Sequence, residues 1–284
     1  MTLIKNRCVL ITGGASGIGK LIAKKCLQKR AYKVVLWDIN EKNLLKTKKE
    51  FANRGYDVDV DVVDVADLED VKRASKHVKE LFRTVDILFN NAGIVVGKPF
   101  AQHSHRDISK TININVSALM HIALEFLPGM IDQRDGHLIN IASAAGLIAN
   151  PNMSVYAASK WAVIGWSESV RLEMEAEETG VHVTTVMPGY INTGMFDGVK
   201  APFLTPTLSP EFIVEKIMKA VKNNEIILQE PFMVKSVPFM KGVLPQKAFD
   251  FLAKKVFGVH GTMDKFKGRP EHEAVPDKDN LSIH

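Results

Sequence analysis

The sequence predicts a doubly wound α/β fold, in which helices cover both faces of a parallel β-sheet. Short apolar runs alternate with longer amphipathic stretches along the chain. Most of the short runs are continuously apolar, which is typical of strands buried on both faces. The strand–helix alternation repeats six times, and the 284 residues suffice for one such unit with a sizeable core.

The strands and helices follow from this periodicity. Strands are expected at seven runs: RCVLIT (7–12), KVVLWD (33–38), VDVDVVD (58–64), DILFNN (86–91), HLINIAS (137–143), HVTTVMP (182–188) and EIILQ (225–229). Amphipathic patterns predict helices over 18–30, 41–53, 67–82, 106–131, 155–178 and 210–223. Ser209 followed by Pro210 is typical of an N-cap with proline at the first helical position.

Composition and charge narrow the class of protein. The 37 basic and 32 acidic residues leave a formal charge of +5, without a dense basic run interleaved with aromatic residues, so we expect no nucleic-acid partner. Cys8 and Cys26 fall in apolar patterns and are expected to be reduced core residues. The histidines are scattered, and His103 and His105 form only a short i,i+2 pair in a polar loop, so no metal site is predicted.

The chain ends and its apolar runs bear on location. The first residues lead into a strand without the apolar core of a signal peptide, and no apolar run is long enough to span a bilayer. The expected location is therefore the cytoplasm.

A glycine-rich turn joins the first strand to the first helix, in TGGASGIGK. Glycines let the backbone approach a pyrophosphate, and the helix N-terminus supplies free N–H groups and positive potential. A plain strand–helix turn that needs positive φ is the alternative, but the strand before and the helix after favour dinucleotide binding. The candidate residues are Gly13, Ser16, Gly17, Ile18 and Gly19.

Asp38 ends the second strand, nineteen residues beyond Gly19. A carboxylate there can accept hydrogen bonds from the ribose hydroxyls of the adenosine and would repel a 2′-phosphate. A basic side chain at position 16 or 39 could neutralise such a phosphate, but these positions hold Ser16 and Ile39. NAD is therefore favoured over NADP. Asp38 could also cap the following helix.

Tyr156 and Lys160 lie one helical turn apart in SVYAASKWAVIG. An amphipathic helix that presents an aromatic–lysine pair is the ordinary interpretation. The alternative is an acid/base couple, in which the ammonium lowers the pKa of the phenol from about 10 towards 7, a shift of roughly 4 kcal/mol.

These motifs and several others, in this order along residues 5–230, resemble those of the short-chain dehydrogenase/reductase family. The others are Asp64-Val65, NNAG at 90–93, Asn115 in NINVS, Ser143 in NIASAAG, and PGYINTGM from 188. The chain looks most like the branch of retinol and hydroxysteroid dehydrogenases, which act on lipophilic alcohols.

The resemblance implies a Rossmann-type three-layer sandwich with a seven-stranded parallel sheet in the order 3-2-1-4-5-6-7, and one dinucleotide-binding catalytic domain over 1–284. Tyr156 would be the acid/base, Lys160 would tune it, Ser143 would hold the substrate oxygen, and Asn115 would hold a water linked to Lys160. Asp64 would bind the adenine amino group, with Val65 beside the ring. The remaining cofactor contacts implied are Asn91, Ala92, Gly93, Pro188, Gly189, Ile191 and Thr193.

The substrate is expected at the C-terminal end of the domain. Residues 190–210 would form a lid, with Met195, Phe196, Phe203 and Leu204 as apolar lining; an ordinary surface loop is the alternative. An amphipathic extension over 231–270 precedes a polar tail over 271–284.

The extension has an apolar stripe at helical spacing, with lysines off the stripe. The stripe is Phe249, Leu252, Val256 and Phe257, and the lysines are Lys247, Lys254 and Lys255. It could lie on an anionic membrane, pack on the protein, or close the pocket of a partner subunit.

The predicted function is NAD(P)-dependent interconversion, with NAD favoured, of a primary or secondary lipophilic alcohol of the retinoid, steroid or long-chain type and its carbonyl compound, by a homodimer or homotetramer. A 3-oxoacyl thioester reductase is one alternative, which Asp38 disfavours because reductive biosynthesis usually draws on NADPH. A catalytically silent nucleotide-binding scaffold is the other, which the set of Asn115, Ser143, Tyr156 and Lys160 disfavours.

Overall fold

The computed structural model describes residues 1–199, 201, 206–256 and 258–268. Its centre is a seven-stranded sheet in the order β3-β2-β1-β4-β5-β6-β7, with every pair of neighbours parallel, as predicted. The strands are β1 Cys8–Thr12, β2 Lys33–Asp38, β3 Asp59–Val62, β4 Ile87–Asn90, β5 Gly136–Ile141, β6 Val181–Pro188 and β7 Ile227–Glu230.

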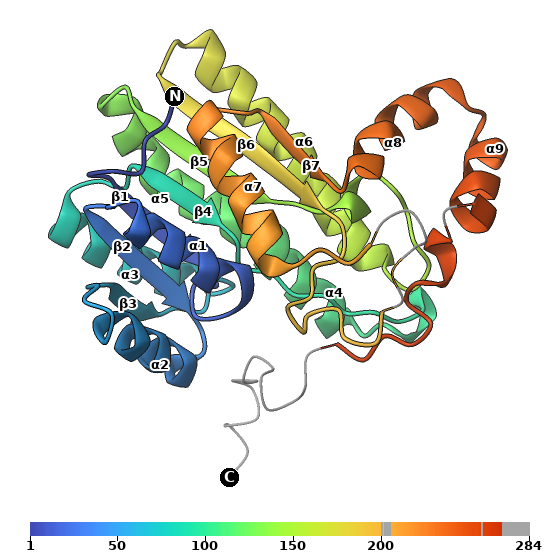
Figure 1. Ribbon diagram of the computed structural model, residues 1–284, viewed down its shortest axis with the longest axis horizontal. Helices are drawn as coiled ribbons and strands as arrows, with labels where there is room; N and C mark the ends of the chain where they lie inside the picture. The colour runs from blue at the N-terminus through green and yellow to red at the C-terminus, as the bar shows by residue number, and fades with distance from the viewer. Residues whose placement is uncertain (200, 202–205, 257, 269–284) are drawn as a thin grey trace.

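Helices cover both faces of this sheet (Figure 1). One face carries α1 Gly17–Gln28, α2 Glu41–Ala52 and α7 Pro210–Asn223; the other carries α3 Leu68–Phe82, α5 Ala118–Asp132 and α6 Ser154–Ala176. The predicted helices begin and end within two residues of the observed ones. The predicted cap of α7 is confirmed, because the Ser209 side chain accepts a hydrogen bond from the backbone N–H of Phe212.

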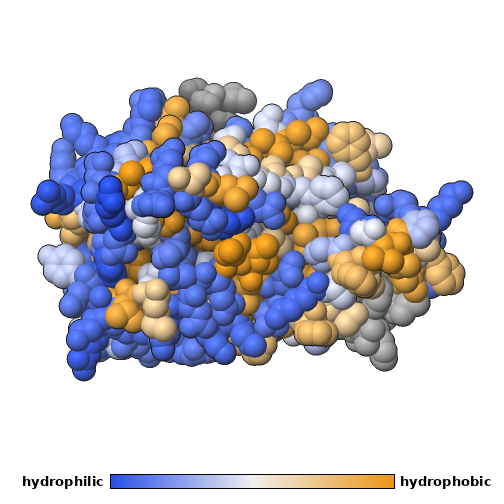
Figure 2. Space-filling view, turned by 90° about the horizontal axis from the view of Figure 1, so that it is seen from above, coloured by the Kyte–Doolittle hydropathy of each residue, from blue (hydrophilic) through white to orange (hydrophobic). Residues whose placement is uncertain are grey.

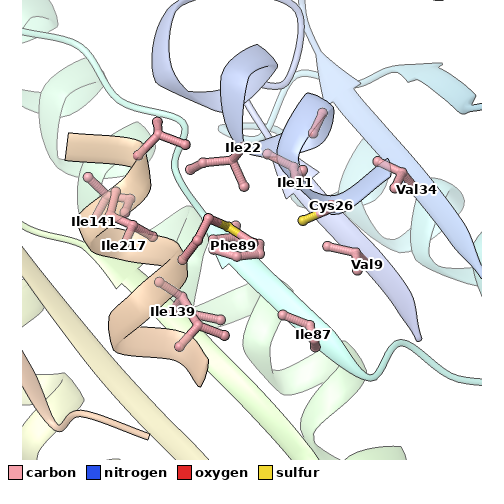
Figure 3. Packing of buried hydrophobic residues seen from close by; sticks show 14 of the residues in the cluster. Val9, Ile11, Ile22, Cys26, Val34, Ile87, Phe89, Ile139, Ile141 and Ile217 are labelled. Atoms are coloured by element: carbon pink, nitrogen blue, oxygen red, sulfur yellow. The ribbon is translucent and has the colours of Figure 1, made fainter. Parts of the chain in front are cut away.

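The core on the α1–α7 face is built from fully buried β-branched residues of neighbouring strands and the helices above them. Figure 3 shows Val9, Ile11, Ile87 and Ile139 of the sheet beneath Ile22 and Ile217 of the two helices. Each such side chain contributes roughly 1.5–3 kcal/mol by leaving water. Cys26 is buried in the same cluster, and both cysteines are free and buried, which confirms that they are core residues.

The predicted helix over 106–131 is interrupted. The helical stretch begins and ends within one residue of the prediction, but it consists of α4 His105–Ile112, the π-helical turn η2 Asn113–Ser117 and α5, and the π-helical turn was not predicted. A π-helical turn inserts one residue into the helical ladder, which apolar periodicity alone does not reveal.

The continuous stretch His105–Asp132 is also long and apolar enough, by length and composition, to cross a membrane. Polar residues such as His121 and Glu125 lie within it, so it is not an uninterrupted apolar run. The inner side of the stretch packs on the sheet and on α3, and 44% of its most apolar window is buried.

The sheet order reverses beside β1, where β2 lies on one side and β4 on the other. In open α/β sheets, ligands bind beyond the carboxyl ends of the strands at such a switch point. The ends of β1, β2 and β4 carry the glycine-rich turn, Asp38 and the NNAG turn, so the fold gathers the predicted cofactor residues at one edge.

The C-terminal extension folds into α8 Phe232–Val243, α9 Gln246–Phe251 and the π-helical turn η4 Leu252–Val256, which project from one end of the sheet (Figure 1). Lys241 of α8 fastens them to the body: its Nζ donates to the Leu147 carbonyl at 3.0 Å and lies 4.5 Å from the centroid of the Trp161 ring. Phe249 of the predicted stripe is buried, Leu252 is half-buried, and Phe257 and the tail over 271–284 lie outside the described residues.

Candidate active site

The glycine-rich turn has the backbone that its sequence requires. Gly13 has φ +62 and Gly17 has φ +53, values that favour glycine. A Cβ on Gly13 would lie 3.1 Å from the Ala92 Cα, and one on Gly19 would lie 2.2 Å from the Gly13 carbonyl oxygen. The turn opens directly into α1, whose first turn has no acidic residue and whose terminal N–H groups and positive potential favour an anion.

The NNAG turn holds the glycine-rich turn in place. The Thr12 hydroxyl accepts hydrogen bonds from the backbone N–H groups of Asn91 and Ala92, both at 3.0 Å. The Asn91 amide nitrogen donates to the carbonyls of Thr12 at 2.9 Å and Gly13 at 3.2 Å. The two turns therefore form one rigid cradle.

Asp38 is tied to this cradle. Its Oδ2 accepts from the Ala15 N–H at 3.1 Å and its Oδ1 accepts from the Asn40 N–H at 3.0 Å. The N-cap of α2 is Asn40, whose side chain accepts from Asn43, so the alternative that Asp38 caps this helix is wrong.

A cleft of about 1100 Å³, counted with the open space at its mouth, runs along the carboxyl edge of the sheet. Sixteen of the predicted cofactor-binding residues line it: Gly13, Ser16, Gly17, Ile18, Asp38, Asp64, Val65, Asn91, Ala92, Gly93, Tyr156, Lys160, Pro188, Gly189, Ile191 and Thr193. Gly19 does not line the cleft, because it lies beneath Gly13 as a packing glycine.

At one end of the cleft, α6 places Tyr156 and Lys160 side by side, and both are buried. The Lys160 Nζ lies 5.7 Å from the centroid of the Tyr156 ring and donates to the Ile141 carbonyl at 2.8 Å. Ser143, at the end of β5, lines the same end of the cleft. Its hydroxyl accepts from the Ala145 N–H at 3.1 Å, so it also caps the short helix that follows.

The protein environment sets the proton affinities of this pair. Burial raises the pKa of Tyr156 to about 12, against a smaller opposing effect of a hydrogen bond with Ser143. Burial also lowers the pKa of Lys160 to about 8. The protein alone therefore moves the phenol away from neutrality, which is opposite to the direction expected for a prepared base.

Asn115 lies in the π-helical turn and acts as a clamp. Its Oδ1 accepts from the Ile94 N–H at 2.9 Å, and its Nδ2 donates to the Ile94 carbonyl at 2.9 Å and to Ser159 at 3.1 Å. Its Oδ1 and the Lys160 Nζ both approach Gly93, where a Cβ would meet them at 3.3 and 3.7 Å. Asn115 does not line the cleft; it fixes the strand end beside Lys160.

A second chamber of about 830 Å³ adjoins the cleft and shares Ser143, Gly189 and Phe196 with it. Its wall is mostly apolar and comes from three methionines and from the inner side of the C-terminal extension. These residues are Met153, Met233, Met240, Val234, Val237 and Phe249. The inner side of the extension therefore packs on the protein, which is one of the three alternatives predicted for it.

The predicted apolar lining of the substrate site is confirmed for two of its four residues. Met195 and Phe196 line the cleft, and Phe196 packs edge-on against Tyr156 with ring centroids 6.0 Å apart. Phe203 and Leu204 lie outside the described residues. Sequence reasoning missed the apolar lining at Ile39, Val63, Ile94, Ile114 and Ile141, which was signalled only by their position at strand ends or beside the motifs.

The sequence matches a protein-family model and resembles several known dehydrogenases. The family model described as short chain dehydrogenase matches residues 7–202. Epidermal retinol dehydrogenase 2 of Mus musculus is 36% identical over 270 residues, 94% of this chain and 87% of the relative. Estradiol 17-beta-dehydrogenase 11 of Pongo abelii is 33% identical over 254 residues, 89% of this chain and 84% of the relative.

A solved structure supports the fold. The short chain dehydrogenase/reductase from Burkholderia phymatum in complex with NAD superposes with a TM-score of 0.78 at 24% identity, covering 85% of this chain and 95% of that one.

Proposed function

The chain belongs to the short chain dehydrogenase family, and we propose that it interconverts a lipophilic alcohol and its carbonyl compound with a nicotinamide dinucleotide. One observation carries the proposal. Ser143, Tyr156 and Lys160 stand together in the dinucleotide cleft, and Ser143 also lines the apolar chamber, so the reacting carbon and the cofactor can meet there. The printed names of the relatives, a retinol and an estradiol dehydrogenase, support a lipophilic substrate.

The residues of the cleft fit the cofactor. Gly13 and Gly17 give the turn the positive φ that brings its backbone to the cleft, the N-terminus of α1 offers its N–H groups to a pyrophosphate, and Asp38 offers a carboxylate to ribose hydroxyls. When bound, the dinucleotide supplies or accepts the hydride.

The protein supplies the proton and the orientation. In oxidation, Tyr156 accepts the proton of the alcohol hydroxyl as the hydride leaves the carbon, and in reduction it returns that proton. Ser143 holds the substrate oxygen by a hydrogen bond. The charged Lys160 stabilises the phenolate, and Asn115 keeps the neighbouring backbone in place. Met195 and Phe196 line the cleft beside Tyr156 and help to exclude water from the reacting atoms.

The test is a substrate panel with a matched variant. Purified protein is assayed with retinoid, steroid, long-chain and sugar alcohols, using both NAD and NADP. We expect turnover of lipophilic alcohols and its loss in Tyr156→Phe, which retains NADH binding by fluorescence titration. A variant that oxidises substrate at the parent rate would remove Tyr156 from the reaction. Binding without turnover of any alcohol would favour the scaffold.

We propose NAD as the preferred dinucleotide, because Asp38 places a carboxylate at the edge of the cleft where a 2′-phosphate would have to lie. Asp38→Ser should raise the ratio of kcat/KM for NADP over NAD tenfold or more. An unchanged ratio would remove Asp38 from this role.

We also propose a homodimer or homotetramer that associates through α5 and α6. Leu124 of α5 is 69% exposed and Leu172 of α6 is 55% exposed, large apolar side chains on two long helices. Light scattering coupled to size-exclusion chromatography should give a dimer or tetramer for the parent and a smaller species for Leu124→Lys. A monomeric parent would refute this assembly.

The outer side of the extension supports a further proposal, that the protein is cytoplasmic and touches membranes peripherally. Phe232, Phe239 and Phe251 are each more than 60% exposed, and Figure 2 shows apolar residues at the end of the molecule where α8 and α9 lie. Exposed lysines accompany them: Lys235, Lys247, Lys254 and Lys255. Aromatic side chains with surrounding lysines favour anionic lipid surfaces.

Co-sedimentation with anionic and neutral vesicles tests the membrane contact. The triple variant Phe232→Ser, Phe239→Ser, Phe251→Ser changes only the outer side and leaves the chamber wall in place. We expect the parent to pellet with anionic vesicles and the variant to stay in solution. Equal recovery of the two proteins would refute the contact.

A further inference from the structure

Two polar side chains besides Ser143 line the otherwise apolar chamber, those of Asn150 and Tyr190. Asn150 lies in the loop between β5 and α6 and is only 8% exposed. No step proposed above uses either side chain. A buried amide in an apolar wall requires its hydrogen-bonding groups to be satisfied, so the partners of each atom are informative.

Asn150, Tyr190 and Thr262 form a hydrogen-bonded cluster that joins three separate segments. The Asn150 Nδ2 donates to the Thr262 hydroxyl at 2.7 Å and to the Tyr190 hydroxyl at 3.1 Å. The hydroxyls of Tyr190 and Thr262 are 2.8 Å apart, and Thr262 donates to the Val259 carbonyl at 3.0 Å. The loop before α6, the loop after β6 and the segment after α9 therefore meet at this cluster.

The hydrogen bonds of the cluster suit an amide whose nitrogen faces the two hydroxyls. The Val259 carbonyl accepts from the backbone N–H of Thr262 at 3.3 Å and from its hydroxyl at 3.0 Å. With its proton on that carbonyl, the Thr262 hydroxyl accepts from Tyr190 and from Asn150. The Asn150 nitrogen then has an acceptor for each of its two protons in the hydroxyls of Thr262 and Tyr190.

The other atom of the amide, Asn150 Oδ1, is buried and has no hydrogen-bond partner among the described residues. A buried acceptor without a donor is unfavourable until a donor reaches it. The Asn150 Nδ2 also lies 3.6 Å from the Met153 sulfur, and Met153 lines the same chamber. Methionine side chains are unbranched and adapt their shape, so the wall beside Asn150 can admit a polar group.

We propose that the Asn150 Oδ1 accepts a hydrogen bond from a second, non-reacting hydroxyl of the substrate. This inference rests on the proposed function and narrows its substrate class to lipophilic diols. A ketone or ether oxygen cannot donate to Oδ1, and a methyl group leaves it unpaired, so both are disfavoured against a hydroxyl on the same skeleton.

The test compares kcat/KM for matched substrates that differ only at the remote position. One set is estradiol, its phenolic methyl ether and its analogue lacking the phenolic hydroxyl; the other is a long-chain α,ω-diol and the matching primary alcohol. We expect the hydroxylated member to be favoured at least tenfold in one set or both. In Asn150→Leu, which is similar in volume and has no acceptor, the ratio should fall to near one. A parent ratio near one in both sets, or a variant that keeps the parent ratio, would overturn the proposal.

Two further measurements separate this role from others. If Asn150 only joined the three segments, Asn150→Leu would lower kcat/KM for both members of a set equally and leave the ratio unchanged. Tyr190→Phe removes a hydroxyl from the cluster but leaves the Asn150 oxygen, so it should retain the preference.

Binding in the presence of NADH, measured by calorimetry, covers the case in which no alcohol is turned over. Tighter binding of the diol by the parent and not by Asn150→Leu would then support Asn150 while the proposed function fails. Equal binding of both members by the parent would overturn the proposal for Asn150.

Discussion

Replacing Lys160 by methionine tests the electrostatic basis of the proposed reaction. Methionine has a similar length, fits a buried site and carries no charge. The Lys160 Nζ lies 5.7 Å from the Tyr156 ring centroid, and at an effective dielectric constant of about 20 this separation corresponds to roughly 3 kcal/mol of phenolate stabilisation. That is about two pKa units.

The total requirement is larger than this contribution. Burial raises the pKa of Tyr156 to about 12, so reaching pH 7 takes about five units, or roughly 7 kcal/mol. The value of about 12 already includes Lys160, so the fall to about 7 is left to the positive charge of the oxidised cofactor and to hydrogen bonding with the substrate oxygen, while loss of Lys160 would raise the pKa of Tyr156 further. Removal of Lys160 should therefore slow the enzyme strongly without abolishing it.

The assay is the pH profile of kcat/KM for alcohol oxidation at saturating dinucleotide. Oxidation rises as the phenol loses its proton, and in Lys160→Met this rise should move about two units to higher pH, with an approximately 100-fold lower rate at pH 7. The parent and variant rates should converge at high pH, where the phenol is ionised in both proteins.

Retained NADH binding and an unchanged melting temperature are the controls for Lys160→Met. Profiles that rise at the same pH in both proteins would refute an electrostatic role for this lysine.

Three other perturbations follow from the structure. Asn115→Ala leaves the N–H and carbonyl of Ile94 unpaired and should lower the free energy of unfolding by about 2–4 kcal/mol in urea titrations, with a fall in kcat; unchanged stability would contradict the clamp. Burial lowers the pKa of His137 to about 3, so the unfolded chain binds an extra proton below about pH 6.5 and stability should fall as pH drops from there, by about 2 kcal/mol at pH 5. His137→Gln should flatten that slope, and an equally steep slope would show another group to be responsible. Gly19→Ala puts a methyl group 2.2 Å from the Gly13 carbonyl oxygen and should weaken NADH binding tenfold or more in fluorescence titrations; parent affinity would show that the turn can yield.

The sheet and the cofactor cleft were predictable because their signals are local. Each strand is a short apolar run, and the polar or glycine residues that end β1, β2 and β4 share one edge once the strands are parallel. The pairing of Tyr156 with Lys160 needs only one helical turn. Each of these features depends on residues close together in the sequence, so local patterns suffice to predict it.

The interruption of the helix at Asn115 was not predictable in the same way. Apolar spacing across NINVS fits a continuous helix, and the π-helical turn is stabilised by contacts from outside it, among them the Asn115 clamp on Ile94. Both ends of the Asn115 side chain are used by Ile94 and Ser159, partners that no local pattern in the sequence reveals.

The substrate chamber was the least predictable part. Asn150 and Thr262 are 112 residues apart, and the wall comes from α8 and α9, whose apolar residues face both inward and outward. No periodicity distinguishes Val237, which lines the chamber, from Phe239, which is exposed on the same helix. Which side of α8 and α9 faces the chamber depends on how the complete chain folds around it.

The three methionines in the chamber wall have a chemical consequence. Met153, Met233 and Met240 give the wall a soft, adjustable surface, and thioether sulfur is also readily converted by peroxides to a polar sulfoxide. Oxidation of these sulfurs would make the chamber wall polar and so weaken its hold on bulky apolar alcohols, without any change to the tyrosine and lysine at the reacting end.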